Sequence, residues 1–215
     1  MSSRAVLFDF DGTLADTAPD LAAAVNRMLV EQGQEPLPLE RLRPFASAGA
    51  RGLLHAAFGL KPDDAEYKVM REEFLDLYAE CCCRETRLFP GVAELLRELG
   101  ARAIRWGVVT NKATRFTERI LLHFQLKPDC VACGDTTPHL KPHPASLLHA
   151  AGQLELSPAA CCYLGDDLRD MKAARAAGMR PIAVDWGYHH PESGGPGSWE
   201  ADAVIAHPME LVRHL

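Results

Sequence analysis

The stretch FDFDGTLADT, residues 8–17, places the carboxylates of Asp9 and Asp11 at the end of an apolar run, with a single residue between them. That run, RAVLF at 4–8, is short and apolar, which predicts a strand buried on both faces. Asp9 and Asp11 would share one face of a continued strand, since side chains alternate with a period of two. Gly12 permits a tight turn directly after them. Taken alone, the stretch also fits a turn with a capping carboxylate.

Further runs predict strands that alternate with helices. The expected strands are 104–110, 129–134, 161–167, 180–186 and 201–206. The expected helices are 92–100, with Gly100 as its C-cap, then 112–124, 144–154 and 167–178. Strands that alternate with helices indicate βαβ units. The predicted fold class is therefore α/β with a parallel sheet.

Residues 18–83 interrupt this alternation, because they contain no good strand pattern. Apolar residues at helical spacing predict amphipathic helices at 20–33 and 63–82. We therefore expect a small all-helical domain, 17–83, inserted after the first strand. The remaining segments, 1–16 and 84–215, would form the α/β core.

Composition limits the partners and the compartment. The 215 residues are 47% hydrophobic and 24% charged, with a formal charge of −6 and no basic block. These values are typical of a globular protein, and they argue against nucleic acid or an anionic membrane as the main partner. We read no signal peptide and no membrane span. The seven cysteines are odd in number and partly adjacent, which favours reduced thiols in the cytoplasm.

Polar side chains follow three of the expected strands. Ligands bind beyond the carboxyl ends of strands in parallel α/β sheets. Asp9 and Asp11 follow the first strand, while Asp166 ends the strand at 161–167. The strand at 104–110 ends in Thr110, and Asn111 and Lys112 come next; Lys141 precedes a proline and so lies in an extended connection. We expect these groups to converge on one rim.

The charges at this rim suggest a metal and an anionic substrate. A cluster of Asp9, Asp11 and Asp166 would repel itself unless a cation lay within it, and oxygen ligands suit Mg²⁺. Lys141 and Thr110 would supply a positive charge and a donor nearby. Mg²⁺ beside such donors is what a phosphate ester requires. One aspartate could attack phosphorus while the other moves the proton.

Four motifs, in this order, resemble those of the haloacid dehalogenase superfamily: DFDGT, VVTNK, Lys141 in HLKPHP, and GDDLRD. The resemblance implies a Rossmann-like core with a helical cap that closes over the substrate. It also implies that Asp9 is the phosphorylated nucleophile and Asp11 the general acid/base. Dehalogenases of the superfamily lack this second aspartate, so Asp11 favours phosphoryl chemistry.

The resemblance further implies a set of binding residues. Mg²⁺ would be held by the carboxylates of Asp9 and Asp166 and by the backbone carbonyl of Asp11. Asp170 would support these ligands or add one, and Asp167 would lie beside them. The transferring phosphoryl group would be held by Thr13, Thr110, Asn111 and Lys141.

Within the superfamily the chain resembles the phosphoglycolate phosphatase branch. A finer likeness is to the bacterial N-acetylmuramic acid 6-phosphate phosphatases of cell-wall recycling, carried by SAGARGLL at 47–54 and by the segment 187–211. Arg51 could face the core and pair with a substrate carboxylate, which both substrates carry. The alternative is an exposed arginine with no role.

Three functions remain open at this point. The first is an Mg²⁺-dependent phosphomonoesterase that acts on a small carboxylated phosphate ester. The second is a β-phosphoglucomutase-like phosphosugar mutase, whose cap would need a site for a second phosphate. The third is a binding module without catalysis. The partner in each case is a small molecule, and the chain could be a monomer or a homodimer.

Overall fold

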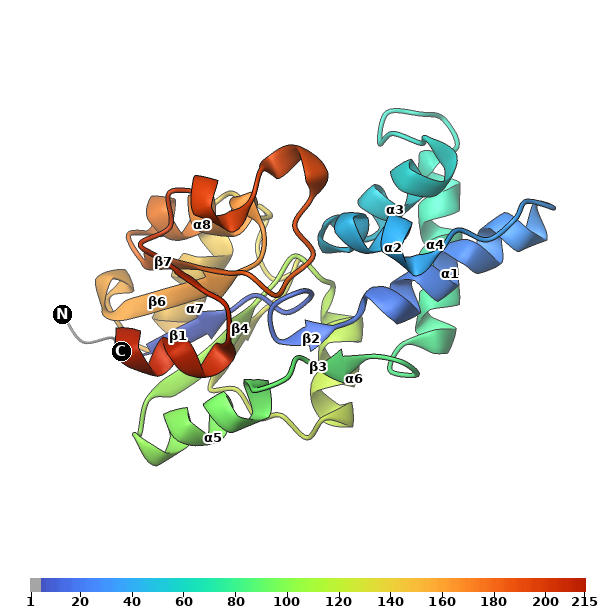
Figure 1. The fold of residues 1–215 in the computed structure, drawn as a ribbon. Coiled ribbons are helices and arrows are strands. Elements are labelled where there is room, and N and C mark those ends of the chain that lie inside the picture. Colours follow the sequence, from blue (N-terminus) through green and yellow to red (C-terminus); the bar gives the residue numbers. More distant parts are fainter. Residues whose placement is uncertain (1–4) are drawn as a thin grey trace.

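The computed structural model describes residues 5–215 and contains a six-stranded parallel sheet between layers of helices (Figure 1). The strand order is β5-β4-β1-β6-β7-β8. The strands are β1 (Ala5–Phe8), β4 (Arg105–Val109), β5 (Cys130–Ala132), β6 (Cys161–Gly165), β7 (Arg180–Val184) and β8 (Ala203–Ile205). Each run expected to be a strand therefore contributes one to this sheet. Arg4, which the first run included, lies outside the described residues.

Helices cover both faces of the sheet. They are α5 (Val92–Ala101), α6 (Thr114–His123), α7 (Ala145–Gln153) and α8 (Leu168–Ala177). Ala5 and Leu7 of β1 belong to one buried cluster with α7 and α8, whereas Val6 and Phe8 belong to another with α5 and α6. This alternation explains why the first strand is apolar on both faces.

The end of α5 differs from the prediction. Gly100 lies inside the helix, which continues to Ala101 and has Arg102 as its C-cap. Ala103, with φ of 55°, takes the left-handed position after the helix, and the amide of Ile104 bonds back to the carbonyl of Leu99 at 2.9 Å. The helix therefore ends after Ala101, and the left-handed residue that follows it is Ala103 and not a glycine.

Between β1 and α5 the chain forms a separate lobe of helices, which lies to one side of the sheet (Figure 1). The elements are β2 (Ala15–Asp16), α1 (Ala18–Glu31), α2 (Leu39–Leu42), α3 (Gly49–Phe58), α4 (Tyr67–Cys81) and β3 (Arg87–Leu88). A 3₁₀ segment, Arg43–Ala48, connects α2 to α3. The four helices α1 to α4 and this segment are called the helical insert below.

The two chain segments that connect the helical insert to the sheet lie side by side. β2 pairs antiparallel with β3. The buried carboxylate of Asp20, in the first turn of α1, accepts hydrogen bonds from the amides of Glu85 and Thr86 at 2.8 and 3.0 Å, and from the Thr86 hydroxyl at 2.6 Å. The departing chain is thus fixed to the returning chain close to the sheet.

Within residues 5–215, every helix is too short or too polar to span a bilayer.

Candidate active site

Three neighbouring strands bring the predicted site residues to one edge of the sheet. β1 lies between β4 and β6, and all three run in the same direction. Asp9 directly follows β1, Thr110 directly follows β4, and Asp166 directly follows β6. The three residues are buried. The carboxyl edge of the sheet therefore carries an enclosed polar site.

An acidic cluster forms the centre of this site. Carboxylate oxygens of Asp9, Asp166 and Asp170 all lie within 4.8 Å of one another. Burial, and then the charges of Asp9 and Asp170, raise the pKa of Asp166 well above its ordinary value. Burial also raises the pKa of Asp170 to about 7, although the charge of Lys141 opposes this shift. Buried carboxylates at this spacing suit a hard divalent cation, so the donor set fits Mg²⁺.

Lys141 supplies the positive charge beside the cluster. Its Nζ lies 2.8 Å from Asp9 Oδ1 and 2.7 Å from Asp170 Oδ1, and it donates to the Tyr163 hydroxyl at 2.7 Å. The side chain is only 3% exposed. The side chain of Asn111 accepts from the Lys141 amide at 2.9 Å and donates to the Lys141 carbonyl at 3.1 Å. Asn111 therefore orients Lys141 through its backbone.

Asp166 is held from several directions. Its Oδ1 accepts from the Thr13 hydroxyl at 3.2 Å, and its Oδ2 accepts from the Ser47 hydroxyl at 2.8 Å and the Tyr188 amide at 2.9 Å. Gly12 has a φ of 83°, and a Cβ added to it would collide with the Asp166 carboxylate. Ser47 belongs to the helical insert, so the insert touches the acidic cluster directly.

The side chain of Asp11 has other hydrogen-bond partners than the three clustered carboxylates. Both of its oxygens accept from Lys112 Nζ at 3.0 Å, and Oδ1 also accepts from the Thr17 hydroxyl at 2.6 Å. The strand ends at Phe8, so the two aspartates are not adjacent members of one strand face. Asp9 and Asp11 therefore stand in different surroundings, each beside its own lysine.

Asp167 is the N-cap of α8, and its partner Arg169 joins the site to the helical insert. Its side chain accepts from the Arg169 amide at 2.8 Å, and Asp170 completes the capping box. Although burial opposes the shift, the Arg169 side chain holds the pKa of Asp167 below its ordinary value. Arg169 also donates to the carbonyl of Ser47 at 3.0 Å. The start of α8 therefore contacts the insert through Arg169.

Arg51 is exposed and lines a cavity between the helical insert and α8. The cavity has a volume of about 490 Å³. Its lining includes Ser47 and Asp167, which lie next to the acidic cluster. Cationic or ionisable side chains from both walls also line it: Arg51, His55 and Lys61 from the insert, Arg169 and Lys172 from α8, and His190 from the loop after β7. Arg51 thus faces this cavity and not the insert's own core.

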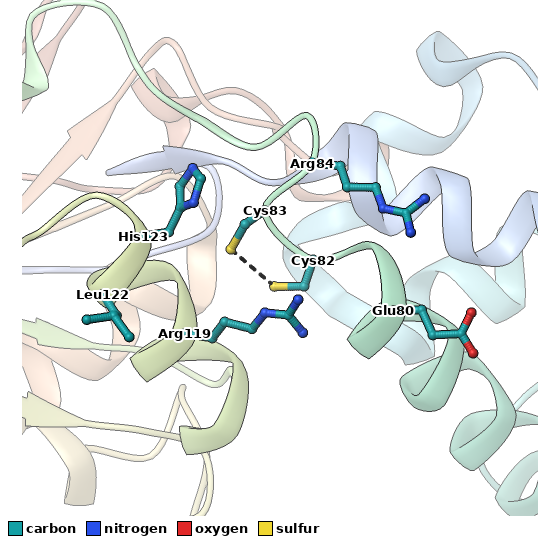
Figure 2. A pocket seen from close by; sticks show the side chains of 7 residues that line it. All are labelled: Glu80, Cys82, Cys83, Arg84, Arg119, Leu122 and His123. Atoms are coloured by element: carbon teal, nitrogen blue, oxygen red, sulfur yellow. Dashed lines mark hydrogen bonds between the residues drawn. The ribbon is translucent and has the colours of Figure 1, made fainter.

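A second cavity, of about 410 Å³, contains none of the clustered carboxylates in its lining (Figure 2). It lies where α4 ends, and the sulfur atoms of Cys82 and Cys83 are 3.7 Å apart there. Burial, and then the neighbouring Cys82, raise the pKa of Cys83 to about 12. The Cys83 thiol is therefore protonated at neutral pH and is a poor nucleophile.

Sequence reasoning did not predict the contacts of several residues of this edge. Lys112 was expected at this rim without a role, and its partner Asp11 is 101 residues away in the sequence. Tyr163 lies within β6, where the sequence indicates only a buried residue of the core. Ser47 and Tyr188 donate hydrogen bonds to Asp166, and no sequence pattern near either residue predicts this contact. Thr110 lies at the carboxyl end of β4, as expected, and its hydroxyl accepts a hydrogen bond from the Lys112 amide at 3.1 Å.

Comparison with known proteins places this geometry in a family. Residues 6–184 match the family described as haloacid dehalogenase-like hydrolase. The N-acetylmuramic acid 6-phosphate phosphatase of Pseudomonas aeruginosa is 43% identical over 214 residues, covering 99% of this chain and 94% of its own length. A phosphoglycolate phosphatase of Xanthomonas campestris pv. campestris is 42% identical over 210 residues, covering 97% and 94%.

A solved structure is similar over the whole chain. It is described as a predicted phosphoglycolate phosphatase from Haemophilus somnus 129pt, and it has a TM-score of 0.88 at 26% identity. The similarity covers 100% of this chain and 98% of the other. By its motifs, its parallel sheet and these matches, the chain belongs to the haloacid dehalogenase-like hydrolase family.

Proposed function

We propose that the chain is an Mg²⁺-dependent phosphomonoesterase that works through an aspartyl-phosphate on Asp9. The observation that carries the proposal is the buried Asp9 carboxylate beside Lys141, with Asp166 in the same cluster. Lys141 would bind the transferring phosphoryl group, and Thr13, Thr110 and Asn111 would position it. The names of the relatives support the same reaction class.

The proposed reaction has two steps. In the first, the Asp9 carboxylate attacks phosphorus, the ester P–O bond breaks, and Asp11 gives its proton to the leaving oxygen. In the second, Asp11 takes a proton from water, the water oxygen attacks phosphorus, and the bond to Asp9 breaks. Inorganic phosphate leaves, and both aspartates return to their starting forms. A mutase would transfer the phosphoryl group to a second sugar position, so a measurement of stoichiometric phosphate release would exclude that alternative.

Mg²⁺ would be held by the carboxylates of Asp9 and Asp166 and by the carbonyl of Asp11, with Asp170 next to them. When bound, it neutralises charge on the phosphoryl oxygens and on the acidic cluster. Lys141 offsets part of that charge without the metal.

Residues 17–83, which contain the helical insert, would be a cap that encloses the substrate. Ser47 and Arg169 support this role, because they join the insert to Asp166 and to the start of α8. Enclosure excludes water from the reacting phosphoryl group. The cytoplasm is the proposed location, in keeping with seven cysteines that form no disulfide within residues 5–215.

For the substrate we propose N-acetylmuramic acid 6-phosphate. The cavity beside the acidic cluster, of about 490 Å³, has the size of a small-molecule site. Its lining contains four lysines and arginines against two acidic residues, Asp167 and Glu192, and such an excess of positive charge suits a carboxylate. A second candidate is 2-phosphoglycolate, which the name of the Xanthomonas relative supports at nearly equal identity. Phosphoglycolate is much smaller and would leave most of this cavity unfilled.

The test compares kcat/KM for three esters with Mg²⁺ present. They are N-acetylmuramic acid 6-phosphate, 2-phosphoglycolate, and N-acetylglucosamine 6-phosphate, which has the sugar without the carboxylate. We expect the first to exceed the other two by at least about tenfold, which is 1.4 kcal/mol of transition-state binding. A preference for 2-phosphoglycolate would replace the substrate proposal, and hydrolysis of no phosphate ester would overturn the reaction class.

A further inference from the structure

Lys112 holds the proton-carrying residue of the proposed reaction, and nothing in that reaction uses the lysine itself. Its Nζ lies 3.0 Å from both oxygens of Asp11, and its side chain is only 5% exposed. A buried ammonium that donates to both oxygens of a carboxylate restricts the position of that carboxylate. Lys112 therefore fixes where Asp11 lies.

The ammonium of Lys112 also contacts the helical insert. It lies 4.8 Å from the centre of the Tyr78 ring, on α4. This ring is buried, packs 4.8 Å from Phe116 of α6, and is stacked 6.3 Å from Phe74 of its own helix. A cation over a desolvated aromatic face is attracted to it, so Tyr78 supports Lys112 from the side of the insert.

Asp11 is linked through side-chain contacts to both ends of the helical insert. The Thr17 hydroxyl, just before α1, donates to it at 2.6 Å. The second connection runs through Lys112 to Tyr78, one turn before α4 ends at Cys81. A displacement of the insert against the sheet would therefore shift both supports of the same carboxylate.

We propose that Lys112 is a positioning residue for Asp11 and that Tyr78 of the insert keeps Lys112 in place. This inference rests on the proposed phosphatase reaction and assigns a role within it. While Asp11 gives its proton to the leaving oxygen, Lys112 holds the carboxylate that forms, and it keeps this carboxylate in place until Asp11 takes a proton from water. Proton transfer thus depends on the placement of the insert.

The leaving group provides a specific test. A sugar or glycolate oxygen needs a proton to leave, whereas p-nitrophenolate leaves without one. We would measure kcat/KM for N-acetylmuramic acid 6-phosphate, 2-phosphoglycolate and p-nitrophenyl phosphate, because kcat/KM includes the step in which the alcohol leaves. The variants are Lys112→Met, Lys112→Arg, Tyr78→Leu and Tyr78→Phe, with the exposed Lys127→Met as the matched control.

We expect Lys112→Met to lower kcat/KM for the alkyl esters by about 100-fold and for the aryl ester by less than about tenfold. Lys112→Arg keeps the charge and should restore part of the loss. Tyr78→Leu should show the same leaving-group dependence more weakly, while Tyr78→Phe keeps the aromatic face and should resemble the wild type. Lys127→Met should change none of the three values.

An equal loss on alkyl and aryl esters in both Lys112→Met and Tyr78→Leu would overturn the positioning role, since a structural defect does not depend on the leaving group. Circular dichroism would identify a variant that fails to fold, and Lys112→Arg and Tyr78→Leu then decide the question. Failure of the wild type to hydrolyse either alkyl ester would instead refute the proposed function, which separates the two failures.

Discussion

The hydroxyl of Ser47, in the helical insert, donates a hydrogen bond of 2.8 Å to Oδ2 of Asp166 at the end of β6. The two residues are 119 positions apart in the sequence. Asp166 is buried in the acidic cluster, and Ser47 also lines the cavity of about 490 Å³. One side chain of the insert therefore contacts both the proposed metal ligand and the proposed substrate space.

Replacement of Ser47 by Ala should weaken the site without unfolding the protein. The change leaves Asp166 Oδ2 with one donor fewer, and a hydrogen bond to a charged group contributes about 1.5–3 kcal/mol. We expect kcat/KM to fall by about tenfold or more and the half-saturating Mg²⁺ concentration to rise. Ser193→Ala is the control, because Ser193 lines the same cavity but its hydroxyl donates to the backbone carbonyls of His190 and Gly194. Similar kinetics in the two variants would contradict the role of Ser47.

Replacement of Asp9 by Asn should abolish turnover and preserve the fold. An amide oxygen can still accept from the Phe10 amide and from Lys141, as Asp9 Oδ1 does now. The amide is not a nucleophile, so kcat should fall by at least about 10⁴-fold. Mass spectrometry after an acid quench should find a phosphoryl group on residue 9 of the wild type only. A variant with more than a tenth of wild-type activity would exclude Asp9 as nucleophile.

The strands and the residues at their ends can be predicted from the sequence, because they depend on local patterns of apolar and polar residues. Each strand of the sheet has an apolar run, and the residues that follow β1, β4 and β6 meet because parallel strands end at the same edge. The pairing of β2 with β3 was not predicted, since each has only two residues and its partner lies beyond the insert. The contact of Ser47 with Asp166 forms only when the insert and core have packed, and that of Lys112 with Asp11 forms only when β1 and β4 have paired. No local signal in the sequence marks either contact.

Replacement of Asp20 by Ala should destabilise the protein more than it affects the chemistry. The change leaves the amides of Glu85 and Thr86 and the buried Thr86 hydroxyl without their acceptor. We expect the free energy of unfolding to fall by about 2–4 kcal/mol, as measured by urea denaturation. Asp63→Ala, at an exposed site in the insert, should change it by less than about 0.5 kcal/mol. Equal changes in the free energy of unfolding for the two variants would show that Asp20 does not hold the two connecting segments together.

Replacement of Arg51 by Ala should impair carboxylated substrates selectively. Arg51 lines the cavity beside the acidic cluster, and a guanidinium pairs well with a carboxylate. We expect KM for N-acetylmuramic acid 6-phosphate to rise by about tenfold, equivalent to 1.4 kcal/mol, with KM for p-nitrophenyl phosphate nearly unchanged. Arg41→Ala, exposed on α2, is the control. An equal rise for both esters would remove Arg51 from substrate recognition.

Removal of Mg²⁺ should make the protein less stable as the pH rises. Burial raises the pKa of Asp166 well above its ordinary value and that of Asp170 to about 7, while an unfolded aspartate titrates near roughly 3.9. Between these values the folded chain binds more protons than the unfolded chain, so the free energy of unfolding falls with increasing pH. With EDTA present, the melting temperature should therefore be higher at pH 5 than at pH 8.

Saturating Mg²⁺ should reduce this difference in melting temperature. The cation competes with protons for the same carboxylates, so it should raise the melting temperature at pH 8 by more than at pH 5. Asp166→Asn is the matched variant, because it removes one of the repelling charges and one metal ligand. Its metal-free form should lose less stability between pH 5 and pH 8 than the wild type, and Mg²⁺ should stabilise it less. A wild-type melting temperature that is independent of Mg²⁺ at pH 8 would argue against a metal in the acidic cluster.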